Sequence, residues 1–167
     1  MYYYAKQTSL GLVTITEERG FITSLIFGHY KIKNIVKPDK NFLSDTIAQA
    51  FSQLEEYLNG ERKEFNLPLN PKGTPFQQKV WSALLSIPYG ETRSYKDVAI
   101  QVGKPNASRA VGMANHENPI PIFIPCHRVI SSDGTLGGYS EGIDIKAKLI
   151  QLEGQSSRKD LPCINQL

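Results

Sequence analysis

The sequence predicts an α+β protein in which a small N-terminal antiparallel sheet with one helix precedes a mostly helical C-terminal domain. Short β-rich runs alternate with turn residues over the first 40 positions, whereas helical periodicity dominates the rest of the chain. The chain has 167 residues, 40% of them hydrophobic, which is enough for a buried core. Its net charge of +3 at pH 7 is compatible with a polyanionic partner but identifies none.

The N-terminal sheet is predicted from three strands, which span residues 2–8, 12–17 and 21–27. Gly11 and Gly20 fall between the strands, which is the spacing of an antiparallel meander. One face of this sheet needs a cover, and a helix predicted over 41–59 supplies it. Apolar residues recur in that segment at helical spacing, and Gly60 stops the helix. These residues are Leu43, Ile47, Phe51, Leu54 and Leu58.

A Pro/Gly-rich stretch over 67–73 is typical of a linker and divides the chain. This division predicts two domains, at 1–70 and 71–167. The helix that follows the linker has a well-marked start, with Thr74 as its N-cap and Pro75 at the first helical position. Gln77 completes a capping box, and the helix is expected to end near Ser86.

Two short helices follow in close order, and their outline is that of a helix-turn-helix. The first spans 95–102 with Ser94 as its cap, and Gly103 ends it. The second spans 107–115 with Asn106 as its cap. Many helix pairs share this outline without binding DNA, so the outline alone leaves both possibilities open.

The second of these helices consists of small residues around one long charged side chain, that of Arg109. Proteins that read the major groove present several long polar side chains to the base edges, and this helix does not. This helix can approach a partner surface closely, and Arg109 is the one long side chain that projects from it. A packing helix would also carry small residues, but a core would not readily house an arginine. The small residues are Ala107, Ser108, Ala110, Gly112 and Ala114.

The segment after the helix pair is expected to carry the reactive site. A proline-interrupted apolar run over 120–125 cannot be helical and is expected to deliver Cys126 to a cleft. A Gly-rich loop over 131–140 follows, and a last helix spans 144–153. Three apolar positions of this helix are expected to pack inward, namely Ile145, Leu149 and Leu152.

Cys126 is the candidate nucleophile, because His127 and Arg128 follow it directly. A thiol becomes a useful nucleophile as thiolate, and neighbouring positive charge or a base lowers its pKa towards neutrality. A cysteine after an apolar run is more often a small buried hydrophobe, but two polar neighbours weaken that alternative. Cys163 is expected to be a second free thiol. No metal site is predicted, because the sequence contains no Cys-x-x-Cys or His-x-x-x-His spacing.

Four segments, in this order and spacing, resemble O6-alkylguanine-DNA alkyltransferases. The similarity is strong over 74–154, and the N-terminal sheet and helix are compatible with the ribonuclease H-like N-terminal domain of that family. The resemblance implies DNA repair by direct, irreversible, single-turnover transfer of an alkyl (methyl) group from guanine O6 to Cys126. It implies no cofactor and leaves O4-alkylthymine open as a substrate. The segments are Arg109-Ala110-Val111-Gly112, Asn118-Pro119, Ile124-Pro125-Cys126-His127-Arg128-Val129-Ile130 and Gly137-Gly138-Tyr139-Ser140.

The resemblance also implies catalytic roles. It identifies Cys126 as the nucleophile, His127 as its base through a bridging water, and Glu153 as the carboxylate that orients His127. From spacing alone, an ordinary surface acid is the commoner role for Glu153. Tyr95 resembles the tyrosine that donates a proton to the guanine ring, with a packing aromatic as the alternative. Asn118 resembles the hinge before the nucleophile strand, although an Asn before Pro is also a common turn residue.

Contacts with DNA are implied in the same way. Arg109 resembles the residue that fills the stack after a nucleotide is flipped out. Its helix fits the minor groove, where narrow space favours small side chains. In the family, the backbone at Cys126, Val129 and Ser140 contacts guanine, and Tyr139 shapes the pocket wall. The other candidate contacts are Ala107, Ala110, Gly112, Lys104 and Arg128, the last with a structural role as its alternative.

The implied partner is double-stranded DNA containing O6-alkylguanine, bound by a monomer, with cooperative binding left open. We expect a cytoplasmic protein without a membrane span, because the chain has neither a long apolar run nor a signal peptide. The sequence departs from the family's pattern in three ways. The ligands of the zinc ion that some members bind are missing, and Glu141 stands where a glycine is common. The segment Asn115-His116-Glu117 differs among relatives, and no role is assigned to it.

Three other functions compete with this interpretation. An alkyltransferase-like protein that binds lesions without repairing them would lack the nucleophile, which is present here as Cys126. A helix-turn-helix regulator would need long polar side chains around Arg109. A cysteine peptidase would bring its Cys and His together across a cleft, whereas Cys126 and His127 are adjacent in sequence.

Overall fold

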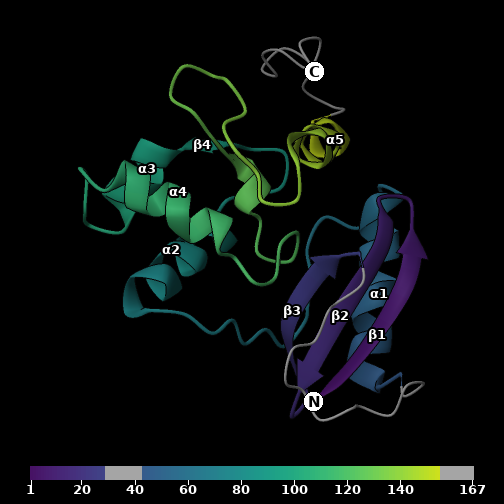
Figure 1. The fold of residues 1–167 in the computed structure, drawn as a ribbon. Coiled ribbons are helices and arrows are strands. Elements are labelled where there is room, and N and C mark those ends of the chain that lie inside the picture. The colour runs from purple at the N-terminus through teal and green to yellow at the C-terminus, as the bar shows by residue number, and fades with distance from the viewer. Residues whose placement is uncertain (29–42, 155–167) are drawn as a thin grey trace. The chain divides into compact units, whose positions relative to one another are not determined.

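The structure is a computed structural model that describes residues 1–28 and 43–154, and it divides into two compact units (Figure 1). One unit comprises Met1–Lys72 with Pro119–Pro121, and the other comprises Gly73–Asn118 with the chain from Ile122 onwards. The first is a three-stranded sheet with one helix and the second is mostly helical, which is the α+β architecture that the sequence predicts. Within the described residues, no helix is long and apolar enough to cross a bilayer.

An antiparallel sheet in the order β1-β2-β3 forms the base of the first unit. Its strands are β1 (Tyr2–Thr8), β2 (Gly11–Glu18) and β3 (Phe21–Phe27), so the three predicted strands are confirmed to within a residue at each end. Val13 and Ile15 of the central strand are fully buried. They alternate with Thr14 and Thr16, as the two faces of a strand require.

The helix α1 (Asp45–Leu58) contacts all three strands (Figure 1). It begins later than predicted, because the Ser44 hydroxyl accepts a hydrogen bond from the Ile47 N–H at 3.1 Å and so caps the helix. The same hydroxyl donates to the buried carboxylate of Glu17 in β2. Leu43 precedes the cap and is 44% exposed, so its predicted place on the apolar face is wrong. Residues 41–42 lie outside the described part of the chain.

Part of the predicted linker pairs with the sheet. The Ile22 N–H donates to the Pro68 carbonyl at 2.8 Å, and the Asn70 N–H donates to the Ile22 carbonyl at 2.9 Å. Leu69 therefore forms a parallel bridge with Ile22 on β3. The pairing uses the carbonyl of Pro68 and needs no N–H from it, which is why a proline is tolerated in this position.

The second unit begins with α2 (Pro75–Leu85), whose predicted start is confirmed in detail. The Thr74 hydroxyl accepts from the Gln77 N–H at 3.2 Å, and the Gln77 side chain accepts from the Thr74 N–H at 2.8 Å. Further along the helix, the indole of Trp81 donates to the Ala114 carbonyl at 2.9 Å. This bond fixes α2 against the helix that contains Ala114.

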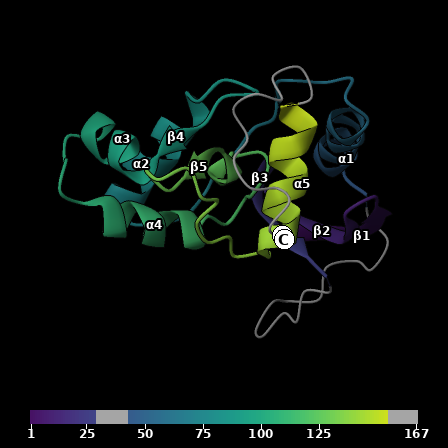
Figure 2. The same ribbon diagram turned by 90° about the horizontal axis from the view of Figure 1, so that it is seen from above.

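The predicted helix pair consists of α3 (Tyr95–Gln101) and α4 (Ser108–His116), and α2 packs against both (Figure 2). Ser94 caps α3, as predicted. The predicted Asn106 cap is wrong, because the helix begins one residue later with Ala107 in the cap position and no side-chain cap. The preceding turn closes through a backbone hydrogen bond donated by the Ala107 N–H, which leaves Asn106 outside the helix.

The apolar run over 120–125 contains no helix, as predicted, and Ile122 adopts a φ of 75° that β-branched residues rarely adopt. It leads to the 3₁₀ turn η1 (Cys126–Arg128) and to the short strand β5 (Val129–Ile130). This strand pairs in parallel with β4 (Arg93–Ser94), which directly precedes α3. The pairing brings the start of α3 beside the strand that leaves the cysteine turn.

The last helix, α5 (Ile143–Glu153), buries a face that differs in part from the predicted one. Leu149 is buried as expected, but Ile145 and Leu152 are only half-buried. Ala147 and Ile150 pack against Leu136 of the Gly-rich loop instead. The buried residues of α5 are Lys146, Ala147, Leu149, Ile150 and Glu153.

Candidate active site

A cavity of about 210 Å³ lies in the second unit, and Cys126 forms part of its wall. Cys126 is 2% exposed, so its sulfur is shielded from bulk solvent. A Cβ at Gly112 would lie 3.8 Å from the ring of Tyr95, so the small residue lets α4 approach this tyrosine closely. The predicted site residues that line the cavity with Cys126 are Tyr95, Gly112, Tyr139 and Ser140.

The Cys126 thiol is protonated at neutral pH in this site. Burial raises its pKa to about 11, although a hydrogen bond from the Asn118 side chain and the charge of Lys146 act in the opposite direction. The expectation that its neighbours lower this pKa towards neutrality is therefore wrong, because desolvation outweighs them. A base must remove the proton before the sulfur can attack.

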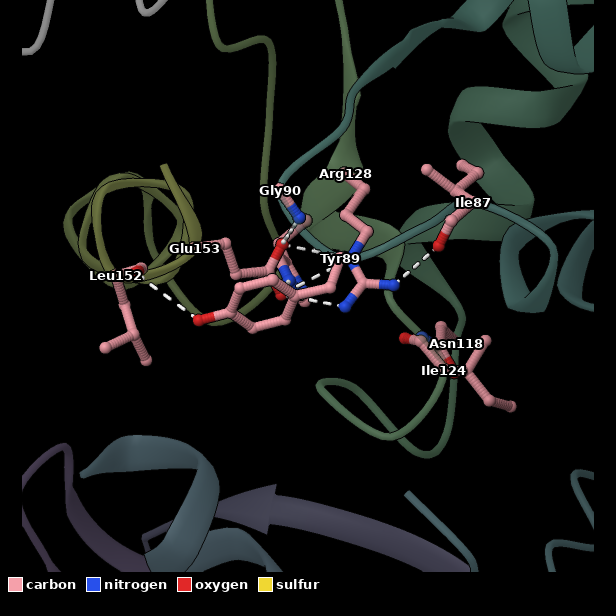
Figure 3. Close-up of polar contacts among 9 residues, drawn as sticks. Ile87, Tyr89, Gly90, Asn118, Ile124, Arg128, Leu152 and Glu153 are labelled. Atoms are coloured by element: carbon pink, nitrogen blue, oxygen red, sulfur yellow. Dashed lines mark hydrogen bonds and ion pairs between the residues drawn. The ribbon is translucent and has the colours of Figure 1, made fainter. Parts of the chain in front are cut away.

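The buried carboxylate of Glu153 contacts both residues that follow the cysteine, and Figure 3 shows its contacts with Arg128. His127 Nε2 lies 2.8 Å from Glu153 Oε1. Arg128 donates from Nε to Oε2 of Glu153 at 3.0 Å and from Nη2 to Oε1 at 2.9 Å, which is a bidentate arrangement. Its Nη1 donates to the Ile87 carbonyl at 2.6 Å, and its guanidinium lies 5.9 Å from the Tyr89 ring centroid. His127, Arg128 and Glu153 are buried, so the interactions among them are little screened by solvent, whereas Tyr89 is half-buried.

The protonation states follow from this geometry. Burial raises the pKa of Glu153, but hydrogen bonds from His127 and Arg128, together with the charge of Arg128, outweigh burial and lower it to about 2. Burial also lowers the pKa of His127, against the influence of Glu153, so the imidazole is neutral. Since the Glu153 carboxylate only accepts hydrogen bonds, Nε2 of His127 carries the hydrogen and Nδ1 is the basic nitrogen.

Lys146 has a place in the site that sequence analysis missed. Its Nζ donates to the Val129 carbonyl at 2.6 Å and to the Gly138 carbonyl at 3.1 Å, and burial lowers its pKa to about 8. It therefore ties α5 to the strand after the cysteine turn and to the Gly-rich loop. The sequence signal that could have found it is a lysine on the apolar stripe between Ile143 and Ile150.

Tyr95 presents a protonated hydroxyl at the cavity. Burial and the neighbouring Cys126 raise its pKa, and a hydrogen bond from the Gly138 backbone only partly offsets them. The Gly-rich loop approaches this hydroxyl so closely that a Cβ on Gly137 would lie 2.6 Å from it. Gly137 has a φ of 71°, so both its backbone conformation and its missing side chain are required here.

The comparisons with known proteins agree with this geometry. Residues 75–155 match the 6-O-methylguanine DNA methyltransferase DNA binding domain, and residues 1–71 match the ribonuclease-like domain of the same protein. The chain belongs to the 6-O-methylguanine DNA methyltransferase family. The predicted family is therefore confirmed.

Relatives in this family match nearly the whole chain. The Bacillus subtilis constitutive methylated-DNA--protein-cysteine methyltransferase is 49% identical over 91% of this chain and 94% of its own. The Methanosarcina barkeri protein of the same name is 45% identical over 95% of this chain and 100% of its own. The solved Mycobacterium tuberculosis OGT in complex with DNA has a TM-score of 0.84 and 43% identity, covering 95% of this chain and 96% of that one. These relatives confirm the predicted fold class and enzyme class.

Several other residues expected to contact DNA in this methyltransferase-family chain are not part of the cavity wall. Arg109 and Ala110 are exposed on α4, Ala107 is half-buried at its start, and Lys104 is exposed in the preceding turn. Arg128 is 7% exposed and its guanidinium is engaged with Glu153 and Ile87. The geometry supports the structural alternative for Arg128, and its contact with DNA stays a prediction.

Two further residues of the site carry no prediction from the sequence. Tyr89 contacts Arg128 and donates from its hydroxyl to the Leu152 carbonyl at 3.4 Å (Figure 3). Asn115 lies in the cavity wall.

Cys163 lies outside the described residues. Among the residues that are described, no group of three or more His, Cys, Asp or Glu side chains is placed to hold a metal ion.

Proposed function

We propose that this chain repairs DNA by transferring an alkyl group from guanine O6 to Cys126 in a single irreversible reaction. One observation carries the proposal. Cys126 lines a cavity, and the next residue, His127, is a neutral base held by the ionised carboxylate of Glu153. The names of the relatives support the same reaction, since they are methylated-DNA--protein-cysteine methyltransferases.

The proposed chemistry begins with the thiol proton, which passes through a bridging water to Nδ1 of His127. The sulfur attacks the alkyl carbon, so that a C–S bond forms while the bond from carbon to O6 breaks. The electron pair of that bond remains with the guanine ring, to which Tyr95 donates a proton. The imidazolium then returns its proton through water to the tyrosinate, so the thiol proton is replaced by an alkyl group and guanine regains its hydrogen.

The same chemistry implies one reaction for each chain. The product is a thioether, and its C–S bond resists cleavage because an alkyl thiolate is a poor leaving group. Glu153 is held by two cationic or hydrogen-bonding partners, and His127 is held by Glu153. The groups that prepare the thiol for attack are therefore not placed to regenerate it.

DNA is the proposed partner, and the Mycobacterium tuberculosis relative solved with DNA supports it. We expect α4 to enter the minor groove and Arg109 to fill the space left by a flipped nucleotide. The backbone at Val129 and Ser140 then contacts the base, and Asn118 fixes the turn to the nucleophile by donating to the Ile124 carbonyl at 2.9 Å. The monomeric state, cooperative binding, O4-alkylthymine as a substrate and the cytoplasmic location stay predictions.

Mass spectrometry after incubation with a duplex carrying O6-methylguanine tests the proposal. The expected result is one methyl adduct on Cys126 and none in the Cys126→Ala variant. An unmodified protein that still binds the duplex would support the lesion-binding alternative. An unmodified protein that binds a defined promoter-like sequence would support the regulator.

A further inference from the structure

Asn115 is a buried amide that uses none of its hydrogen-bonding capacity. It is 8% exposed and lies at the end of α4. Among the described residues, neither its Nδ2 nor its Oδ1 has a hydrogen-bond partner. Burying an amide without partners is unfavourable, because the group gives up its bonds to water. An arrangement of this kind suggests that a bound molecule supplies the missing partner.

The position of Asn115 indicates which part of a bound molecule it meets. It lines the same cavity as Cys126. It also precedes Asn118 by three residues, and the Asn118 side chain is hydrogen-bonded to Cys126. Asn115 and Cys126 therefore both face the space that a bound lesion would fill. In the proposed reaction, the O6 substituent of the lesion must reach the sulfur. The guanine edge is contacted by backbone groups and Tyr95, so the substituent is the part of the lesion left for Asn115.

We propose that Asn115 is a specificity-determining residue that hydrogen-bonds a hydroxyl group on the O6 substituent of the lesion. This inference rests on the proposed function. An amide offers a donor and an acceptor side by side, and a hydroxyl is the small group that matches both. The cavity should therefore favour substituents such as 2-hydroxyethyl over apolar substituents of equal size. An apolar residue at position 115 would reverse that preference, because it leaves the hydroxyl without a partner.

Two duplexes that differ in one atom of the lesion test the inference. One carries O6-(2-hydroxyethyl)guanine and the other O6-propylguanine, whose substituents have the same number of heavy atoms. The ratio of their rates of Cys126 alkylation is measured for the wild type and for Asn115→Leu, which keeps the size of the side chain and removes its polarity. We expect this ratio to fall about tenfold in the variant, as for the loss of one buried hydrogen bond.

Using a ratio within each variant removes any general effect on DNA binding or thiol reactivity. Met113→Leu is the matched control, because Met113 is on the same helix but is 59% exposed, and its ratio should equal that of the wild type. If Asn115→Leu does not fold, Asn115→Ala provides the same comparison. Equal ratios in the wild type and the Asn115 variant would overturn the inference. A wild type that forms no adduct with O6-methylguanine would instead overturn the proposed function.

Discussion

His127 and Glu153 are joined through a 2.8 Å contact between Nε2 and Oε1, although 26 residues separate them in the chain. The contact is fully enclosed, since the side chains are 0% and 3% exposed. It fixes the tautomer of the imidazole and connects the cysteine turn to the end of α5. Because Arg128 shares the same carboxylate, one acid holds both residues that follow the nucleophile.

Replacing Glu153 with Gln should destabilise the protein by about 3 kcal/mol at pH 7, because it leaves the buried Arg128 without its counter-ion. The pKa of Glu153 is lowered from 4.5 to about 2, so its contribution to stability is present above pH 4.5 and is lost as the pH falls towards 2. Urea denaturation should therefore show a steeper loss of unfolding free energy on acidification in the wild type than in the variant. Glu91→Gln, at an exposed ion pair with Arg93, should change little. Equal losses of unfolding free energy in Glu153→Gln and Glu91→Gln would contradict this role of Glu153.

Replacing His127 with Gln should change how the rate of alkyl transfer depends on pH. With the pKa of Cys126 at about 11, only about one thiol in ten thousand is ionised at pH 7 without a base. The variant's reaction with free O6-benzylguanine should therefore rise about tenfold per pH unit between pH 7 and 10. If His127 is the base, as proposed, the wild type should show a flatter profile and a higher rate at pH 7. Parallel profiles would mean that His127 does not remove the proton.

Replacing Gly137 with Ala should slow alkyl transfer at least about tenfold, because the new Cβ would displace the Tyr95 hydroxyl that lies 2.6 Å away. An alanine at the positive φ of Gly137 should also destabilise the folded protein by about 1 kcal/mol. Gly103→Ala is the matched control, because Gly103 also has a positive φ but has open space around it. Thermal unfolding should shift similarly in both variants, while the rate with free O6-benzylguanine should fall in Gly137→Ala alone. A similar fall in both would point to backbone strain rather than to Tyr95.

Replacing Arg109 with Ala should slow repair of O6-methylguanine in a duplex by about 100-fold, because extruding a base costs a few kcal/mol that the arginine partly offsets. Arg109 is exposed and lies outside the cavity wall, so the reaction with free O6-benzylguanine should change less than about twofold. Single-turnover rates on both substrates measure the difference. Equal losses on the two substrates would remove the proposed role in nucleotide flipping.

Local sequence patterns predicted the secondary structure well where local chemistry decides it. The capping box of Thr74 and Gln77 involves neighbouring residues only, and its predicted bonds are both present. The Asn106 cap failed because a backbone hydrogen bond in the preceding turn competes with the side-chain cap. A single sequence does not indicate which of two such local bonds forms.

The electrostatics of the site depend on contacts between distant segments and could not be predicted in the same way. Arg128 looked like a cation beside the thiol, but its charge is paired with Glu153 from the last helix. Lys146 carried no prediction, since a long charged side chain is seldom buried and the two carbonyl groups that bind it come from other segments. The family resemblance identified the residues that meet at the cavity, whereas the raised pKa of Cys126 required knowledge of its burial.

The protonated, enclosed thiol of Cys126 has a consequence for the lifetime of the protein in the cell. Peroxides and small electrophiles react with thiolates that they can reach, and Cys126 at rest is protonated and only 2% exposed. In the proposed reaction each chain acts once, so a thiol lost to oxidation or chance alkylation would be one repair lost. Burial and protonation slow these side reactions, and they should therefore preserve the supply of active molecules until lesions appear.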